Sequence, residues 1–162
     1  MRPFRIAPAR SPADIEAAAA LFRAYAAGLE IDLAYQGFAE ELAGLPGLYA
    51  PPAGELLLAS GETAGRLGCV ALRPFEGERI CEMKRLYVEP AARGLGVGQA
   101  LAAAIIGAAR DLGYAEMRLD SLPSMAPAIA LYRKLGFAEI PAYYPSPIAG
   151  TRYFSLGLSP LR

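Results

Sequence analysis

The sequence contains no histidine. Its absence excludes a serine–histidine–aspartate or cysteine–histidine relay, a histidine zinc site and a zinc protease of the His-Glu-x-x-His type. A general base in this chain must therefore be a glutamate, an aspartate, a lysine, a tyrosine, a cysteine or a water molecule. We expect no metal cofactor.

Cysteine and long apolar segments are scarce as well. The two cysteines, Cys69 and Cys81, lie too far apart for a Cys-x-x-Cys motif, and we expect a reduced, cytoplasmic protein without a disulfide framework. The longest strongly apolar stretch, Leu101 to Ala109, is far shorter than the ~20 residues that cross a bilayer. The charged N-terminus is followed by no apolar segment of the secretory kind. We therefore predict neither a signal peptide nor an association with membranes.

The chain also lacks an excess of either charge. Lys and Arg together number 16, as do Asp and Glu, so the formal net charge is zero. A dedicated nucleic-acid-binding protein usually carries a basic surplus, and we expect no nucleic-acid partner. With 54% hydrophobic and 20% charged residues, the composition is that of a globular protein.

Helix and strand signals alternate along the chain. Ser11 and Pro12 mark a helix start, because serine caps helix N-termini and proline suits the first helical position. Helices are expected over residues 12–28, 38–42, 97–112 and 125–135, and strands over residues 2–6, 55–59, 64–72, 79–88, 115–119, 137–140 and 151–158. Residues 30–35 and 141–147 are expected to be irregular. Without a repeat or a linker, residues 1–162 predict a single α/β domain.

Three glycines at alternate positions, Gly94, Gly96 and Gly98, join a predicted strand to a predicted helix. The Rossmann pattern Gly-x-Gly-x-x-Gly/Ala fails here, because its last position falls on Gln99 or Leu101. The Walker A pattern fails too, since no glycine–lysine–serine/threonine run follows. Neither standard nucleotide loop therefore fits, which disfavours a binding module for other nucleotides.

The loop nevertheless suits a pyrophosphate. Glycines let backbone N–H groups approach an anion closely and permit unusual dihedral angles. The helix that follows presents unpaired N–H groups and a partial positive charge, and Arg93 adds a full one. A glycine-rich turn without any ligand is the alternative interpretation of the loop alone.

Two motifs resemble one family. Arg93-x-x-Gly96-x-Gly98, preceded by Leu86-Tyr87-Val88-Glu89-Pro90, is similar to motif A of the GNAT superfamily of acyl-CoA-dependent N-acyltransferases. The segment from Ala128 to Phe137 resembles the family's later Ala-Ile-x-Leu-Tyr-x-x-Leu-Gly-Phe pattern, and the two motifs stand in the family's order. The resemblance covers about residues 80–140.

The resemblance implies a fold and a co-substrate. The fold would be a mixed, mostly antiparallel central sheet with helices on both faces. A splayed parallel strand pair, Leu86–Val88 against Met117–Leu119, would lie at the coenzyme A (CoA) site, where backbone groups of the first strand would bind the pantetheine amides. The co-substrate would be acetyl-CoA. The residues implied to bind it are Leu86, Tyr87, Val88, Arg93, Gly94, Leu95, Gly96, Val97, Gly98, Gln99 and Tyr132.

The resemblance also suggests catalytic residues. Tyr132 matches the family tyrosine near the CoA sulfur and would protonate the leaving thiolate, unless it merely packs against the pantetheine arm. Glu82 is the candidate base, directly or through water, and an exposed strand carboxylate is the alternative. By strand alternation we expect Glu82, Lys84, Leu86 and Val88 to face one side of the sheet.

The amine acceptor, of a small molecule or a protein, would bind outside the two motifs. The candidate acceptor-site residues are Glu30, Asp32, Tyr35, Tyr143 and Tyr144, with loop surface and packing as the alternative roles. Lys84 and Arg85 could position an acidic acceptor or simply be solvated. Relatives often carry asparagine seven residues before the tyrosine, where this chain has Met125, and Ser124 is a candidate substitute.

Two functions follow from the resemblance. The first is acetyl transfer from acetyl-CoA to a primary amine by direct attack in a ternary complex. The second is a non-catalytic, CoA-binding regulatory domain. Many relatives dimerise, so a homodimer stays open.

Overall fold

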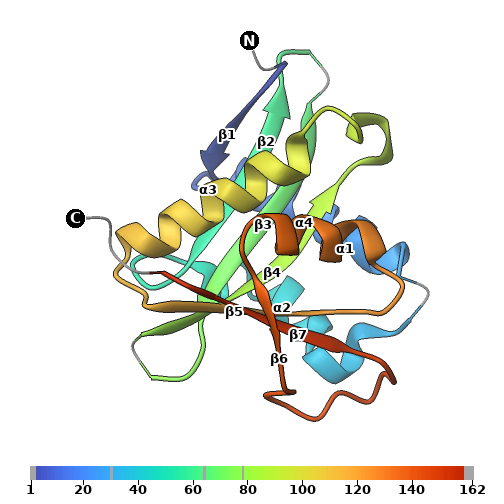
Figure 1. Ribbon diagram of the computed structural model, residues 1–162. Helices are drawn as coiled ribbons and strands as arrows, with labels where there is room; N and C mark the ends of the chain where they lie inside the picture. The colour runs from blue at the N-terminus through green and yellow to red at the C-terminus, as the bar shows by residue number, and fades with distance from the viewer. Residues whose placement is uncertain (1–2, 30, 64, 78, 159–162) are drawn as a thin grey trace.

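A computed structural model describes residues 3–29, 31–63, 65–77 and 79–158. These residues form a seven-stranded sheet in the order β1-β2-β3-β4-β5-β7-β6 (Figure 1). The strands are β1 (Phe4–Pro8), β2 (Glu55–Gly61), β3 (Arg66–Pro74), β4 (Ile80–Val88), β5 (Glu116–Ser121), β6 (Ala138–Ile140) and β7 (Arg152–Gly157). Every neighbouring pair is antiparallel except β4 and β5, which are parallel.

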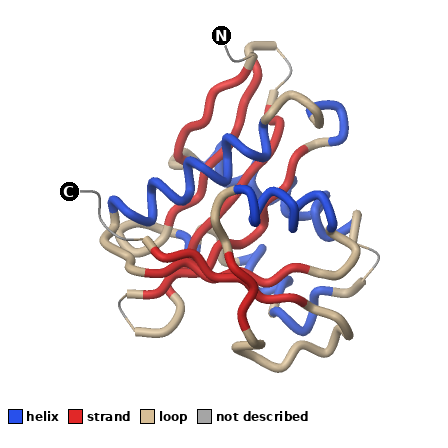
Figure 2. The backbone as a smooth tube through the Cα atoms, in the orientation of Figure 1, coloured by secondary structure: helices blue, strands red, loops and turns tan. Residues whose placement is uncertain are grey.

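Helices cover both faces of the sheet (Figure 2). The α-helices are α1 (Pro12–Ala27), α2 (Phe38–Ala43), α3 (Val97–Asp111) and α4 (Ala126–Lys134), and short 3-10 helices are η1 (Leu33–Gln36), η2 (Gly47–Tyr49) and η3 (Pro90–Ala92). α3 connects β4 to β5, as a parallel pair requires a crossover. Among the described residues, no helix is long and apolar enough to cross a membrane. The expected mixed sheet with helices on both faces is confirmed.

Two apolar clusters fill the space between the helices and the sheet. On the face that we call the α3 side, Leu101 and Ile105 of α3 pack with Val70 of β3 and Met117 of β5. On the opposite face, the α1 side, Phe22 of α1 is among the residues that pack against strand residues of β2 and β3. β2 and β3 alternate their side chains between these two cores.

A β-bulge interrupts the alternation in β4. Cys69 of β3 pairs with Tyr87, whereas Ala71 pairs with Lys84, so two β4 residues stand opposite one residue of β3. Arg85, in the bulge, has a φ of 62°, in the left-handed region that few non-glycine residues adopt. Tyr87 therefore follows Lys84 on the α1 side, where Cys69 and Ala71 also lie.

The bulge corrects the expectation that Glu82, Lys84, Leu86 and Val88 share one side. Glu82 pairs with Arg73 in the register of the α1 side, whereas Leu86 and Val88 pack against the core of the α3 side. One inserted residue reverses the parity of a strand, so simple alternation fails beyond it.

The parallel pair separates soon after it forms. Register pairs join Ile80 to Glu116, Cys81 to Met117 and Glu82 to Arg118, and the described residues show none beyond. β5 instead pairs along its whole length with β7. The predicted splay is present, but Met117 lies in the paired part, so the strands part after Arg118 rather than along Met117–Leu119.

Most predicted elements are confirmed with small shifts at their ends. The first strand begins at Phe4 instead of residue 2, which lies outside the described residues. The strand expected from residue 64 begins at Arg66, and residue 64 is likewise outside them. The segment expected to be irregular contains η1, whose start is capped by Asp32, because its Oδ1 accepts a hydrogen bond from the Ala34 amide.

We predict that Leu101→Ala lowers the free energy of unfolding by about 2–5 kcal/mol, because Leu101 is fully buried between α3 and the sheet. Leu112→Ala, at the end of the same helix and 42% exposed, is the matched control and should change it by less than about 0.5 kcal/mol. Urea unfolding measures both. Equal losses in the two variants would contradict the packing described here.

Candidate functional site

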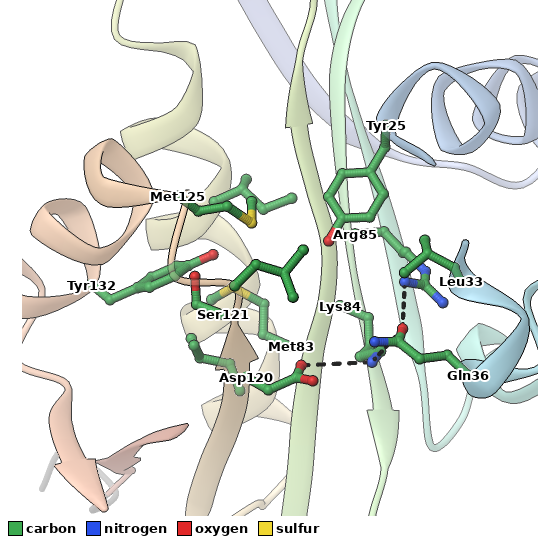
Figure 3. Close-up of a pocket in the computed structure, with 13 residues that line it drawn as sticks. Tyr25, Leu33, Gln36, Met83, Lys84, Arg85, Asp120, Ser121, Met125 and Tyr132 are labelled. Carbon is green, nitrogen blue, oxygen red and sulfur yellow. Dashed lines mark hydrogen bonds and ion pairs between the residues drawn. The ribbon is translucent and has the colours of Figure 1, made fainter. Parts of the chain in front are cut away.

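A narrow cavity lies where β4 and β5 part, and residues from both faces of the sheet line it (Figure 3). Its volume is about 30 Å³, room for about two water molecules. From the α3 side the lining includes Leu86, Ser121, Met125 and Tyr132. From the α1 side it includes Tyr25, Gln36, Lys84 and Asp120. The cavity therefore connects the two faces.

A wider groove adjoins this cavity. The groove has a volume of about 450 Å³ and shares Tyr25, Leu86 and Met125 with the cavity. Its walls continue along β4 to Val88 and on to Arg93 at the glycine loop. A long, flexible ligand lying in the groove could thus reach the cavity with one end.

The glycine loop ends at the N-terminus of α3. Gly94 and Gly96 have φ values of 87° and 83°, which favour glycine, and a Cβ added at either would meet nothing within 4 Å. Backbone conformation, not crowding, therefore requires them. Gly96 caps α3 without any side-chain hydrogen bond, so the first amides of the helix have no side-chain acceptor there. Arg93 Nε donates to the Val88 carbonyl at 3.1 Å, which fixes the arginine beside the loop.

Two side chains that carry hydroxyls, Tyr132 and Ser121, line the cavity from the α3 side. Tyr132 of α4 is 6% exposed, its ring packs against Phe137 and Phe154, and no described residue hydrogen-bonds its hydroxyl. Burial raises the pKa of Tyr132 above its ordinary value of 10. Ser121 Oγ is also buried without a hydrogen-bond partner. Buried hydroxyls normally find partners, so this wall of the cavity is suited to a polar ligand.

Lys84 and Asp120 face each other from the α1 side. Lys84 Nζ lies 3.8 Å from Asp120 Oδ1 and 3.3 Å from Gln36 Oε1. The Tyr144 hydroxyl donates to Asp120 Oδ2. Burial lowers the pKa of Lys84, and the Asp120 carboxylate partly offsets that effect.

Glu82 belongs to a separate cluster. Arg73 Nε and Nη2 both donate to Glu82 Oε1, at 3.0 and 2.9 Å, and the Tyr143 hydroxyl donates to Oε2 at 2.6 Å. The side chain is 2% exposed and is not part of the cavity lining. The structure therefore does not bring Glu82 together with Tyr132.

Known proteins resemble this chain over most of its length. The model described as the Acetyltransferase (GNAT) family matches residues 21–137. The chain belongs to the GNAT acetyltransferase family. The match includes the glycine loop and the segment of Tyr132, and it confirms the resemblance found in the sequence.

Relatives and solved structures agree with this assignment. An uncharacterized N-acetyltransferase of Schizosaccharomyces pombe is 40% identical over 154 residues, which cover 95% of this chain and 94% of the relative. A GNAT-family acetyltransferase from Staphylococcus aureus aligns with a TM-score of 0.78 and 18% identity, covering 96% and 99% of the two chains. The Salmonella typhimurium protein yncA, solved with its cofactor acetyl-CoA, aligns with a TM-score of 0.67 and 22% identity, covering 97% and 95%. Both structures share the GNAT fold with this chain.

The predicted cofactor residues of this GNAT chain fall into two groups. Leu86 and Tyr132 line the cavity, and Leu86, Tyr87, Val88 and Arg93 line the groove. The others lie on the loop and the first turn of α3: Gly94, Leu95, Gly96, Val97, Gly98 and Gln99. Of these, Val97 is buried in the core, and Leu95 is half-exposed and lines a different hollow. Their part in binding stays a prediction.

The predicted acceptor residues are only partly brought together. Tyr143 and Tyr144 reach the carboxylates of Glu82 and Asp120, respectively. Asp32 caps η1, and the Tyr35 hydroxyl accepts a hydrogen bond from Gln36 Nε2. Glu30 lies outside the described residues.

Sequence reasoning missed Gln36, Asp120 and Ser121 as site residues. Asp120 and Ser121 end β5, and the carboxyl ends of adjacent parallel strands are a common ligand position, which was the available signal. The position of Gln36 depends on how η1 packs, and nothing local in the sequence marks it. Among the described residues, no three metal-ligating side chains form a cluster.

We predict that Glu82→Gln lowers the free energy of unfolding by about 1–3 kcal/mol, because it weakens a buried, charged hydrogen-bond cluster. Glu55→Gln, which affects the exposed pair with Arg10, is the matched control and should cost at most ~1 kcal/mol. Both values come from urea unfolding at pH 7. A loss for Glu82→Gln no larger than that of the control would show that the cluster contributes little.

Proposed function

We propose that the protein transfers an acetyl group from acetyl-CoA to a primary amine of a small molecule or protein, by direct attack within a ternary complex. The observation that carries the proposal is the cavity through the sheet. A groove suited to the cofactor reaches it from one end, charged side chains reach it from the α1 side, and Tyr132 stands between them. The acetyl-CoA found with the Salmonella typhimurium neighbour supports the choice of co-substrate.

The residues present fit acetyl-CoA. The amides at the start of α3 and Arg93 would hold the pyrophosphate. The edge of β4 from Leu86 to Val88, which has no described strand partner on the β5 side, would bind the pantetheine amides. The partnerless hydroxyl of Ser121 marks the inner end of this path as polar.

Tyr132 and Ser121 act at the sulfur of the cofactor. When bound, acetyl-CoA supplies the thioester, whose acetyl carbon is transferred and whose sulfur departs. Tyr132 holds a proton on Oη, and its raised pKa keeps that proton in place throughout the neutral range, ready for donation to the departing sulfur. Ser121 Oγ offers a second hydrogen bond from the same wall of the cavity.

The proposal assigns the base to Asp120 rather than Glu82. Asp120 lines the cavity, and Lys84 Nζ, at 3.8 Å, is the one charged partner of its Oδ1 among the described residues. Both carboxylate oxygens of Glu82 already accept hydrogen bonds, from Arg73 and Tyr143. Asp120 can therefore orient the amine and accept its proton, while Glu82 fixes Tyr143.

We predict that acetyl-CoA at about 100 times its Kd raises the melting temperature by roughly 5–10 °C, because binding to the native state alone is worth ~2.7 kcal/mol there. Arg93→Met should weaken the effect, since it removes the positive charge beside the glycine loop. Arg110→Met, an exposed arginine in the last turn of the same helix, is the control. A flat titration of the wild-type protein would rule out acetyl-CoA binding.

We predict that Tyr132→Phe lowers kcat by roughly 10²- to 10⁴-fold, because phenylalanine cannot donate a proton to the sulfur. The Kd for acetyl-CoA should change little, since the ring is retained. Tyr114→Phe, which removes a partly buried hydroxyl bonded to the Ala53 carbonyl, is the matched control and should keep kcat. Thiol release detected in steady state measures both.

Two outcomes would alter the account of Tyr132. A kcat for Tyr132→Phe within about twofold of wild type would show that Tyr132 only packs against the cofactor and does not donate a proton. A wild-type kcat that falls between pH 8 and 10 through loss of this proton would contradict the raised pKa. Tight acetyl-CoA binding without turnover of any amine would instead favour the CoA-binding regulatory domain.

A further inference from the structure

Three ion pairs lie on the α1 side of the sheet near the cavity, and two of them are closed. Arg73 donates twice to Glu82. Arg85 donates through Nε and Nη2 to the two oxygens of Glu41, at 2.9 and 3.0 Å, and through Nη1 to Gln36 at 2.8 Å. Such doubly bonded pairs satisfy the guanidinium and the carboxylate at the same time. They have little capacity left for a ligand.

In the third pair, Lys84 with Asp120, no hydrogen bond joins the two side chains, and we call this pair open. The 3.8 Å between Nζ and Oδ1 exceeds hydrogen-bonding distance, and the ammonium donates instead to Gln36 Oε1 at 3.3 Å. Both side chains are nevertheless largely buried, 6% and 10% exposed. Among the described residues, the Lys84 ammonium donates one hydrogen bond, to Gln36, and the Asp120 carboxylate accepts one, from Tyr144 through Oδ2. The remaining ammonium protons and Asp120 Oδ1 can therefore still take a partner.

We propose that the acceptor carries an amine and a carboxylate on the same carbon, as a free α-amino acid does. Lys84 Nζ binds the carboxylate, and Asp120 Oδ1 binds the ammonium group. The inference rests on the proposed acetyl transfer and adds the chemical class of its acceptor.

The spacing favours an α-amino acid over longer analogues. Backbone bond lengths place the nitrogen and the nearer carboxylate oxygen of an α-amino acid about 3 Å apart. Lys84 Nζ and Asp120 Oδ1 are 3.8 Å apart, a separation that two adjacent groups of opposite charge can match. An ω-amino acid in its extended form holds its two charges several bonds further apart, so they do not match the 3.8 Å between Lys84 Nζ and Asp120 Oδ1.

The charge of the pair also argues against amines without a carboxylate. Such a cation would compete with Lys84 for Asp120 and would leave the buried ammonium of Lys84 with Gln36 alone. A zwitterion instead supplies one partner to each charge and leaves the site neutral. Gln36 Oε1 accepts from both Lys84 and Arg85, which holds the two cations beside each other without supplying a negative charge.

The transfer balances with these residues. The acceptor's ammonium group loses one proton to Asp120 and thence to solvent, and its nitrogen forms the bond to the acetyl carbon. The carbon–sulfur bond breaks, the sulfur takes the Tyr132 proton, and the second amine proton replaces it. The products are the N-acetyl amino acid, free CoA thiol and one proton.

The test compares three sets of amines with acetyl-CoA: the free L-α-amino acids, their carboxamides, and γ-aminobutyrate with simple alkylamines. We expect at least one amino acid to exceed its own carboxamide in kcat/KM by on the order of 10- to 100-fold, the range for a hydrogen bond to a charged group. Carboxamides or alkylamines that react as well as every free amino acid would overturn the inference and leave the proposed acetyl transfer intact.

Variants of Lys84 decide whether this side chain makes the distinction. In Lys84→Met the ratio between amino acid and carboxamide should fall towards one, mainly through a higher KM for the amino acid. Lys84→Arg should restore part of it, and Arg110→Met, which removes a remote exposed cation, should keep it. An unchanged ratio in Lys84→Met would overturn the assignment. If Lys84→Met does not fold, Lys84→Arg takes its place in the test. A ratio between amino acid and carboxamide that Lys84→Arg keeps in full, at an unchanged KM for the amino acid, would contradict a carboxylate site that depends on the position of the Lys84 ammonium.

Failure of the proposed function gives a different result. If no amine of any class is acetylated while acetyl-CoA still raises the melting temperature, the chain is a binding domain and this inference falls with the enzyme. Asp120→Asn distinguishes the residue that binds the amine from Lys84, which binds the carboxylate. This variant should lower kcat/KM for amino acids and carboxamides alike, because both carry the amine.

Discussion

The separation of β4 from β5 is the constraint on which the rest of the structure depends. After three register pairs the two strands part, and β5 continues against β7 instead. The parting leaves one edge of β4 without a strand partner among the described residues, and it lets side chains from both faces of the sheet meet in one cavity. The bulge at Arg85 adds to this, because it directs Lys84 to the α1 side and Leu86 to the α3 side.

The ion pairs around the cavity differ in whether hydrogen bonds join their two members. Two arginine–carboxylate pairs are closed and stiffen the α1 side, with Arg85 also lying over the ring of Phe38. Lys84 and Asp120 are buried with a gap between them. On the other face, the hydroxyls of Tyr132 and Ser121 have no hydrogen-bond partner within the part of the chain that the structure describes. Ser121, Tyr132, Lys84 and Asp120 all line the cavity where the two strands part, which is where two substrates would have to meet.

The sequence predicted most helices and strands and the position of the glycine loop. The features that it did not predict depend on contacts between residues far apart in the chain. The glycine loop, α3 and the Tyr132 segment carry local signals, and their placement was correct. The bulge was not predictable from alternation, because Arg85 holds its left-handed φ within contacts to Glu41, 44 residues earlier in the chain. Tyr143, 61 residues later, donates a hydrogen bond to Glu82, and nothing in the sequence indicated this contact. Glu82, the predicted base, is held in that contact and is not part of the cavity lining.

The central claim is that the cofactor's thiol end enters the cavity through the parted strands. A crystal structure with CoA tests this most directly. The account predicts the pyrophosphate at the start of α3, the pantetheine arm beside Leu86 to Val88, and the sulfur within hydrogen-bonding reach of Tyr132 Oη. Clear density for CoA on another surface, or with its sulfur remote from Tyr132, would contradict it.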